Sequence, residues 1–451
     1  MVTRRQILQA GGALALTAGT GPLLASRAAA TRQQDIVINF WNWWGVAREP
    51  LMKQIIASFE TSHPHITIKD IVRPFVNLNQ QVVTALASGK PPQVIMATRQ
   101  EIVAFAAQGS LIPITPYVKA ARLNLKRFYP QEQATMYWKG ELYSMPMPTA
   151  GGETSLYFYN KDMFMRAGLN PQRPPLTWKE LEAATAKLTK RSANGKIDVL
   201  GADILAAAAT GDFSASFISW LYTNGGTLYS NDLKTVTFNN AQGVATLQWM
   251  IDVINKYYGG VQHYADFFTN STGESGQYPF YQNRQGIWFN NVSTFFHIKT
   301  LAPHLNYSVE LRPYNSANAH AQSHGVAGLS FGWGYVIPKG FDTATNQAAF
   351  DWIRAITYDQ GACQFMLAQE RPSPLIDCNN NPAFAKANPH WEMVKEALRH
   401  DVALPIVPQQ TRILDLIDRN VQSAFYGQVS AKQALDAAAM AAQPLLVMSN
   451  G

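Results

Sequence analysis

The fold is decided early in the chain by the stretch Ile36-Val37-Ile38-Asn39-Phe40-Trp41-Asn42-Trp43-Trp44-Gly45. Its apolar run at 36–41 predicts a buried strand. A helical pattern follows at 50–59, with Pro50 near the helix start, where proline is tolerated. Strand-like runs and helical patterns then alternate along the next residues: 66–68, 78–87, 94–96 and 100–107. This alternation indicates βαβ units around a mostly parallel sheet.

The same pattern recurs farther along the chain. Residues 156–159 predict a strand, and Thr177-Trp178-Lys179-Glu180 has the form of a capping box that opens a helix to Lys190. Further helices are predicted at 244–254, at 348–356 and from a second capping box at 430–433 to a residue before Pro444. There is no low-complexity linker, so we expect two α/β lobes joined by several crossing segments.

Composition excludes several classes of protein. The chain has 451 residues, of which 47% are hydrophobic, 11% aromatic and 15% charged, whereas ordinary domains have roughly 25% charged residues. A disordered chain would be more charged and less hydrophobic. Two cysteines are too few for a disulfide scaffold. The composition therefore indicates a large globular protein with an excess of aromatic over charged residues.

Net charge argues against a nucleic-acid partner. The formal charge is +7, but residues 1–30 contain Arg4, Arg5 and Arg27 and no acidic residue. The rest of the chain has 34 basic and 30 acidic residues, a net charge of +4. Such a balance is too weak for a protein that neutralises a phosphate backbone.

The N-terminus has the form of an export signal. Arg4-Arg5 precede a modestly apolar segment from Ala10 to Ala25, and Ala28-Ala29-Ala30 provides a cleavage site. The arginine pair favours the twin-arginine route, with an ordinary secretory signal as the alternative. We therefore predict that residues 1–30 are a twin-arginine signal peptide and that the mature protein, from about Thr31, is periplasmic.

Two cysteines lie in the exported part of the chain. A bridge between Cys363 and Cys378 would close a loop of about 15 residues and contribute roughly 3 kcal/mol to stability. The alternative is that Cys363 is a small buried residue on a helix. The sequence leaves this choice open.

Several blocks of sequence together carry a family resemblance. The strongest is Leu156-Tyr157-Phe158-Tyr159-Asn160-Lys161-Asp162-Met163-Phe164, followed by Ala167-Gly168-Leu169 and Pro175-Leu176-Thr177-Trp178. The others are 40–45, 87–95, 107–114, 224–226, 334–340 and 427–430, all in order along the chain. In these blocks the chain resembles extracellular solute-binding proteins of bacterial ABC importers, the family that includes maltose-binding protein. Gln93 departs from the pattern, which usually has aspartate there.

The resemblance implies an α/β fold of two lobes with an interdomain cleft and three crossover segments. We place the crossovers near 149–153, 276–280 and 333–336. The N-terminal lobe then comprises 31–149 plus 280–333, and the C-terminal lobe comprises 150–279 plus 334–451. Ligand is expected between the lobes, which close around it by a hinge motion.

Candidate ligand residues follow from what a sugar needs, namely aromatic platforms and a few placed polar groups. In the order of the chain, the candidates are Trp41, Trp43, Trp44, Arg99, Gln100, Glu153, Phe217, Trp220, Tyr222, Trp288, Asn290, Asn291, Ser293, Trp333 and Arg371. Structural roles compete with these. The tryptophans after the first strand could fill a core corner, Arg99 and Gln100 could simply begin a helix, and Arg371 could pair with a surface acid.

Motifs of other chemistries fail in their context. Gly328-Leu329-Ser330-Phe331-Gly332 matches the hydrolase pattern G-x-S-x-G, but a strand-like run follows it where that motif requires a helix. Neither His63 and His65 nor His320 and His324 have the further ligands of a metal site. We therefore expect no metal and no cofactor.

The sequence as a whole favours a monomeric periplasmic substrate-binding protein that delivers a carbohydrate or polyol to an ABC transporter permease, and no enzymatic activity. One alternative is a binder of a phosphorylated or sulfonated polyol or sugar, in which Arg99 or Arg371 would hold the anion with two hydrogen bonds. A less favoured alternative is an exported glycoside-active enzyme, which would need two carboxylates across a cleft.

Overall fold

The structure is a computed structural model that describes residues 35–45, 48–147, 149, 151–152, 154–205, 212–269, 276–327, 329 and 332–450. The predicted signal peptide at 1–30 and the candidate Glu153 lie outside these residues. Residues 36–451 form one compact unit, in which two five-stranded sheets each form the centre of a lobe.

The first sheet has the strand order β2-β1-β3-β13-β6. Its strands are β1 (Ile36–Asn42), β2 (Ile66–Val72), β3 (Val94–Thr98), β6 (Met145–Pro146) and β13 (Trp333–Val336). β1 pairs in parallel with β2 and β3, as the alternating pattern predicted. β13 runs antiparallel between β3 and β6. The predicted βαβ units are thus confirmed, with β13, which runs antiparallel to β3, and then β6 added at one edge.

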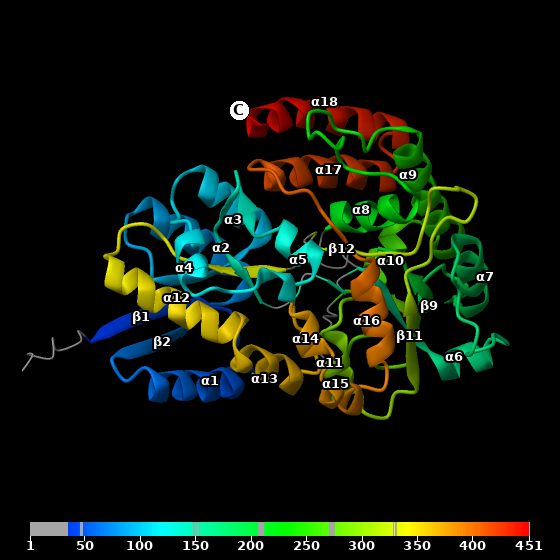
Figure 1. Ribbon diagram of the computed structural model, residues 1–451. Coiled ribbons are helices and arrows are strands. Elements are labelled where there is room, and N and C mark those ends of the chain that lie inside the picture. The colour runs from blue at the N-terminus through cyan, green and yellow to red at the C-terminus, as the bar shows by residue number, and fades with distance from the viewer. Residues whose placement is uncertain are drawn as a thin grey trace, which may run out of the picture. The chain divides into compact units, whose positions relative to one another are not determined.

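The second sheet has the order β11-β7-β10-β9-β8. Its strands are β7 (Leu156–Asn160), β8 (Lys190–Arg191), β9 (Ile197–Asp203), β10 (Gln285–Phe289) and β11 (Tyr307–Leu311). β10 is parallel to β9 and antiparallel to β7, which also pairs with β11. Figure 1 shows β1 and β2 in one lobe and β9 and β11 in the other.

The sheet pairing corrects the predicted lobe boundaries. β10 lies within 280–333, the segment assigned to the N-terminal lobe, but it pairs in the second sheet. β13 pairs in the first sheet, and the helix that follows it packs on β1. The two segments were wrongly assigned because an apolar run predicts a strand without indicating its distant partner.

The helices lie around the two sheets (Figure 1). Those of residues 49–223 are α1 (Glu49–Ser62), α2 (Phe75–Ala87), α3 (Arg99–Ala107), α4 (Thr115–Ala120), α5 (Pro130–Ala134), α6 (Lys161–Arg166), α7 (Trp178–Leu188) and α8 (Phe213–Thr223). Those of residues 241–450 are α9 (Ala241–Val253), α10 (Val261–Phe267), α11 (Thr294–Leu301), α12 (Thr343–Thr357), α13 (Gln360–Ala368), α14 (Ile376–Asn379), α15 (Pro382–Ala387), α16 (Trp391–His400), α17 (Gln410–Phe425) and α18 (Ala431–Asn450). Short strands pair as β4 (Tyr137–Trp138) with β5 (Glu141–Leu142) and β12 (Val326–Ala327) with β14 (Val402–Ala403).

The last helix is longer than predicted. α18 continues through Pro444 to Asn450, although proline normally ends a helix. Leu446 beyond the proline is buried, and α18 packs along α17. This packing outweighs the hydrogen bond that the proline removes.

The chain passes between the sheets at three places. The first passage, between β6 and β7, agrees with the predicted crossover near 149–153. The second runs from β11 to β13 and therefore ends at the predicted position 333–336. The third lies between α13, which packs on α1 and α12, and α17, which packs on α8. No crossing occurs at 276–280, because the strands on either side, β9 and β10, both belong to the second sheet.

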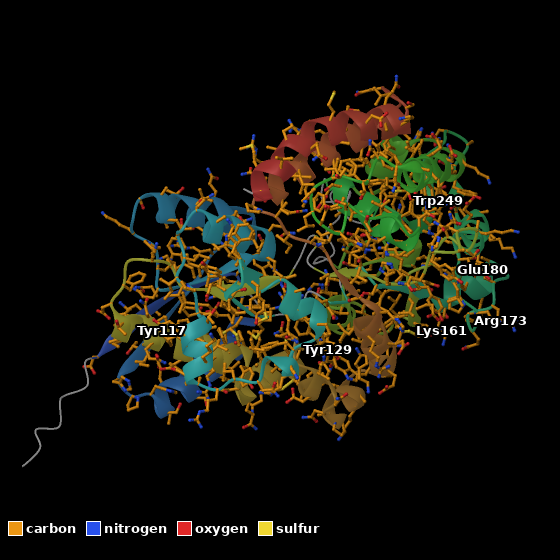
Figure 2. The ribbon with its side chains drawn as sticks, turned by 45° about the horizontal axis from the view of Figure 1, so that its top comes forward. Tyr117, Tyr129, Lys161, Arg173, Glu180 and Trp249 are labelled. Atoms are coloured by element: carbon orange, nitrogen blue, oxygen red, sulfur yellow. A yellow bond between two sulfur atoms is a disulfide. The ribbon has the colours of Figure 1, made fainter. Side chains whose placement is uncertain are left out.

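Much of the aromatic excess lies in the cores. Trp44 and Trp352 are fully buried in the first lobe. In the second lobe, Trp178 stacks on Trp249 with ring centroids 3.9 Å apart, and Trp220 meets both rings edge-on. Figure 2 labels Trp249. Aromatic side chains bury large apolar areas, so these residues stabilise the two lobes.

Cys363 and Cys378 form a disulfide, which decides the choice that the sequence left open. The bridge joins α13 to α14, with the two Cα atoms 5.6 Å apart. It therefore closes the loop that contains Glu370 and Arg371.

In the described part of the chain, no helix has the length and apolar character needed to cross a bilayer.

Candidate functional site

The candidate site lies between the edges at which the two sheets face the crossover segments. In the first sheet, this edge holds the end of β1 with Trp43, the end of β3 with Arg99, and the start of β13 with Trp333. In the second sheet, it holds the ends of β9, β10 and β11 and the start of β7. Ligands of α/β proteins collect at such carboxyl-terminal edges.

One cavity of about 350 Å³ is lined by both lobes. The first lobe contributes α2 and the start of α3, and the second lobe contributes the starts of α8 and α17. The lining residues are Asn79, Thr98, Gln100, Glu101, Asp212, Ser214, Leu329, Thr411, Leu414, Asp415 and Asp418. In Figure 1, α3 and α17 face each other across the two lobes. This is the interlobe cavity.

The charged residues that line the interlobe cavity are all acidic. Asp212 caps α8 by accepting from the Ala215 N–H at 2.8 Å, and Asp418 accepts from the Ser214 N–H at 3.0 Å. Glu101 forms a capping box with Thr98 at the start of α3. Burial raises the pKa of both Glu101 and Asp418. The cavity therefore offers carboxylate acceptors, which suit hydroxyl donors better than an anion.

The tryptophans after β1 divide into two environments. Trp44 is fully buried, and its indole N–H donates to the Tyr335 hydroxyl at 2.6 Å, so it belongs to the core. Trp43 is half-buried between Trp44 and Trp333, with ring centroids 4.8 and 5.3 Å away. Trp41 lies under the Arg73 guanidinium. Trp333 is 1% exposed, so of this pair only Trp43 keeps part of its ring open at the edge of the first sheet.

Arg99 and Gln100, adjacent in sequence, have different environments. Arg99 is 1% exposed and forms an ion pair with Glu132 while also donating to Thr135. The Arg99 guanidinium is therefore occupied by protein groups, and its role is structural. Gln100 lines the interlobe cavity and donates to the Leu329 carbonyl in the second crossover.

Several candidates of the second lobe are core residues. Phe217 and Trp220 are fully buried on α8, and Trp288 stacks on Tyr278 with centroids 4.3 Å apart. Burial gives these residues a packing role, and every residue of α8 is buried. Tyr222 is also buried and meets the His324 ring edge-on.

The remaining candidates lie at loops. Asn290, Asn291 and Ser293 form a half-buried turn after β10, in which the Asn291 side chain accepts from the Ser293 N–H at 2.8 Å. This turn sits at the cleft edge of the second sheet and remains a candidate contact. Arg371 is buried in the loop closed by the disulfide and does not line the interlobe cavity.

Contacts between side chains also join the lobes away from the cavity. Lys299 on α11 of the second lobe forms an ion pair with Glu370, which follows α13 of the first lobe. Arg48, before α1, donates to Gln369 at 2.9 Å and places its guanidinium 5.9 Å from the Phe296 ring on α11. These residues hold the two lobes against each other in the present conformation.

The crossovers meet at one buried carboxylate that the sequence did not suggest. Asp401, in the third crossover, accepts from the Gly152 N–H at 2.6 Å and from the Ser155 hydroxyl, both in the first crossover. It also accepts from the Gly325 N–H in the second crossover at 3.1 Å. Burial raises the pKa of Asp401 to about 6. All three connections between the lobes are therefore tied together at this hinge.

Glu132 supports the same hinge from the first lobe. Its carboxylate accepts from the Thr149 hydroxyl and from the Gly151 N–H at 3.2 Å, in addition to its ion pair with Arg99. Local sequence gave no signal for Glu132 or Asp401, because each acts through partners that are distant along the chain.

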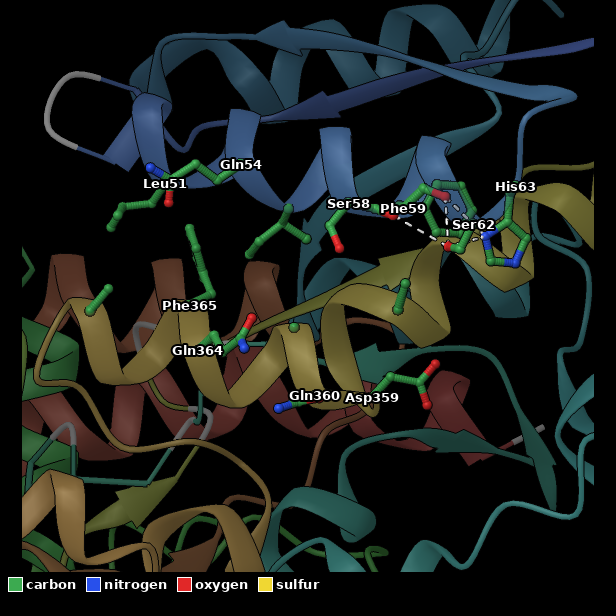
Figure 3. A pocket seen from close by; sticks show the side chains of 14 residues that line it. Leu51, Gln54, Ser58, Phe59, Ser62, His63, Asp359, Gln360, Gln364 and Phe365 are labelled. Atoms are coloured by element: carbon green, nitrogen blue, oxygen red, sulfur yellow. Dashed lines mark hydrogen bonds between the residues drawn. The ribbon is translucent and has the colours of Figure 1, made fainter.

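A second depression, of about 340 Å³, lies within the first lobe between α1 and α13 (Figure 3). Its walls include Leu51, Phe59 and Phe365, and His63 at its end bonds to Ser62 and to the Phe59 carbonyl. None of its lining residues comes from the second lobe, so it does not have the features of an interlobe ligand site.

The described residues contain no group of three or more histidine, cysteine or acidic side chains placed to hold a metal ion.

Around the G-x-S-x-G match, Gly328, Ser330 and Phe331 lie outside the described residues, and the segment after Gly332 is the strand β13.

Comparison with known proteins gives a consistent result. A family model described as bacterial extracellular solute-binding protein matches residues 54–392. The chain is 22% identical over 417 residues to the sn-glycerol-3-phosphate-binding periplasmic protein UgpB of Yersinia enterocolitica, covering 86% of this chain and 87% of that protein.

Solved structures match the same fold. A solute-binding protein of an ABC transporter from Thermotoga lettingae, bound with alpha-D-tagatose, has a TM-score of 0.73 and 25% identity, covering 91% of this chain and 99% of that one. The maltose-bound protein MalE3 from T. maritima has a TM-score of 0.72 and 19% identity, covering 91% and 100%.

Proposed function

Because this chain belongs to the bacterial extracellular solute-binding proteins, we propose that it captures a sugar or polyol and delivers it to an ABC transporter permease. The observation that carries this proposal is the interlobe cavity, to which both lobes contribute polar side chains. A ligand that touches both lobes favours the closed arrangement over the open one, because it gains contacts only there. Closure in turn presents a defined surface to a membrane partner.

The chemistry of the cavity favours a neutral polyhydroxylated ligand. Carboxylates, amides and hydroxyls line it, and the half-buried Trp43, which packs against the buried Trp333, adds an aromatic ring at the sheet edge. Tagatose and maltose, the ligands of the two structural relatives, are neutral sugars. These features support a sugar or polyol as the ligand.

A phosphorylated or sulfonated polyol is the second candidate, and UgpB, which is named for glycerol-3-phosphate, is the observation in its favour. The structure weighs against the expectation that Arg99 or Arg371 holds an anion with two hydrogen bonds. Arg99 is occupied by Glu132, Arg371 does not line the interlobe cavity, and the cavity itself carries acidic groups. An anion there would meet carboxylates of its own sign.

The family consists of binding proteins, and we propose that this chain performs no catalysis. Among the cavity carboxylates, Asp212, Asp418 and Glu101 already accept hydrogen bonds from helix starts. Turnover of oligosaccharides by the purified protein would overturn this part of the proposal.

Family membership supports a periplasmic location. We further propose export by the twin-arginine route, on the basis of Arg4-Arg5, and a monomeric mature protein. Replacement of both arginines by lysine is expected to retain the protein in the cytoplasm, as measured by cell fractionation. Normal export of that variant would support the alternative secretory route.

The ligand proposal is tested by a thermal-shift screen. A specific ligand at one hundred times its Kd should add about 2.7 kcal/mol to the unfolding free energy. The panel should contain monosaccharides, disaccharides, glycerol and sn-glycerol-3-phosphate. Stabilisation by neutral sugars or polyols is expected. An unchanged melting temperature with all of them would contradict the proposal.

A further inference from the structure

Arg312 lies where the second sheet meets two crossovers. It directly follows β11, and its backbone N–H donates to the Ser155 carbonyl in the first crossover at 2.7 Å. Its own carbonyl accepts from the Ser323 hydroxyl, which is in the second crossover, at 2.7 Å. The residue is therefore fixed where the end of β11 meets the first and second crossovers.

The side chain of Arg312 is held rigidly. Only 5% of the residue is exposed. The Nε–H donates to the Thr154 carbonyl at 2.5 Å, and the guanidinium carbon lies 4.4 Å from the Trp220 ring centroid and 4.6 Å from that of Phe289. Aromatic faces attract a guanidinium and fix its plane, so little side-chain freedom remains to be lost when a ligand binds.

The two terminal nitrogens of Arg312 lack a partner in the described part of the protein. The structure gives neither Nη1 nor Nη2 a hydrogen bond, and no described carboxylate lies within 4.0 Å. Neither nitrogen is sealed off from the outside, in contrast to Arg73 Nε, which is buried without a hydrogen bond. These two nitrogens therefore keep some exposure, and an acceptor from outside the protein can reach them.

The surroundings of Arg312 indicate the charge of that acceptor. Burial lowers the pKa of Arg312, while Asp203, fully buried at the end of β9, favours its charged form; the oxygens of Asp203 accept from Tyr264 and from Tyr278. The interlobe cavity adds further carboxylates and no lysine or arginine. With this much negative charge nearby, a neutral ligand is favoured over an anion.

We propose that Arg312 is a ligand-contacting residue that donates Nη1–H and Nη2–H to neighbouring hydroxyl oxygens of a neutral sugar or polyol. The planar guanidinium fork matches two adjacent oxygens, which makes the residue selective for a diol. This inference rests on the proposed function, because it assumes a ligand at the crossover-facing edge of the second sheet, where β11 ends.

The test is titration calorimetry on the purified mature protein with D-tagatose, maltose, mannobiose, glycerol and sn-glycerol-3-phosphate. Arg312→Gln should weaken binding of the best neutral ligand by about a hundredfold, since it removes hydrogen bonds to a charged donor.

Arg284→Gln is the matched control. Arg284 also stacks on a phenylalanine, Phe267 at 5.1 Å, and donates from Nε to a carbonyl, that of Asp198 at 3.3 Å. It precedes β10 and so lies at the sheet edge opposite the cleft. Its replacement should leave the affinity within about twofold of the wild type, because a twofold change is only a fraction of one kcal/mol.

The outcomes separate the two claims. Equal affinity of Arg312→Gln and wild type for a neutral sugar would overturn the role of Arg312 while leaving the proposed function intact. Binding of sn-glycerol-3-phosphate alone would overturn the neutral ligand. No binding of any of these probes by the wild type would overturn the proposed function itself, and the Arg312 role with it. If Arg312→Gln does not fold, a crystal structure of the wild-type complex decides, with Nη to ligand oxygen distances of about 3 Å expected.

Discussion

At the level of single residues, the first lobe depends on the buried ion pair between Arg99 and Glu132. Removing one partner of such a pair leaves an uncompensated charge in the interior. We therefore expect Arg99→Met to lower the free energy of unfolding by about 3–5 kcal/mol. Urea denaturation measures this change. The matched control is Arg127→Met, which breaks the partly exposed pair with Asp377 and should cost about 1 kcal/mol. Equal effects of the two substitutions would contradict the structural role of Arg99.

Asp401 gives a pH-dependent prediction. Its pKa is raised from 3.8 to about 6 in the folded protein, so the folded state holds this proton at pH values where the unfolded chain has released it. Stability from this group is therefore greatest below about pH 4 and declines as the pH rises to about 6, by up to roughly 3 kcal/mol.

The measurement compares the wild type with Asp401→Asn in urea at several pH values. The comparison is needed because burial lowers the pKa of His324 and His390, which changes stability in the opposite direction in both proteins. The advantage of the wild type over the variant should shrink between pH 4 and pH 7. An advantage that grows over this range would contradict the assignment.

The residue scale also shows the limit of sequence-based prediction. Trp44 and Trp43 are adjacent and chemically identical, yet one donates to Tyr335 in the core and the other borders the cleft. Arg99 looked like a ligand residue because its acidic partner lies 33 residues away, on α5. Arg312 carries no motif, and its importance emerges only where β11 meets two crossovers. Side-chain roles of this kind depend on tertiary packing.

At the level of elements, local patterns were reliable. The strands β1, β2, β3 and β7 and the capping box of α7 occur where the sequence predicted them. Pairing across the sheets was not predictable in the same way, since β10 and β13 are both short apolar runs and the sequence does not mark which sheet each one joins.

The disulfide between α13 and α14 closes a loop whose residues reach the second lobe through Glu370. Replacing both cysteines by serine should lower the unfolding free energy by about 3 kcal/mol, because the unfolded chain gains freedom. Thermal unfolding of the oxidised wild type and of the Cys363→Ser/Cys378→Ser variant measures the effect. Identical melting temperatures would show that the bridge does not constrain the chain in solution.

At the level of the whole molecule, the contacts of α11 with the first lobe predict how closure is stabilised. Lys299→Ala removes the ion pair with Glu370 that joins the lobes, so the open arrangement should become more populated and the ligand affinity should fall by about two- to fivefold, equivalent to under 1 kcal/mol. Lys53→Ala, which breaks an exposed pair within α1, is the control. Calorimetry measures the affinity, and small-angle scattering measures the compactness without ligand. An unchanged affinity would show that this ion pair does not contribute to closure.

The central claim is that a neutral sugar or polyol binds between the two lobes. Small-angle X-ray scattering of the mature protein, with and without the best ligand from the neutral panel, tests this claim most directly. A ligand that contacts both lobes favours the closed arrangement, so the radius of gyration should decrease on saturation with that sugar and stay constant with sn-glycerol-3-phosphate. Compaction by the anion alone, or a radius that no neutral sugar or polyol changes, would contradict the account.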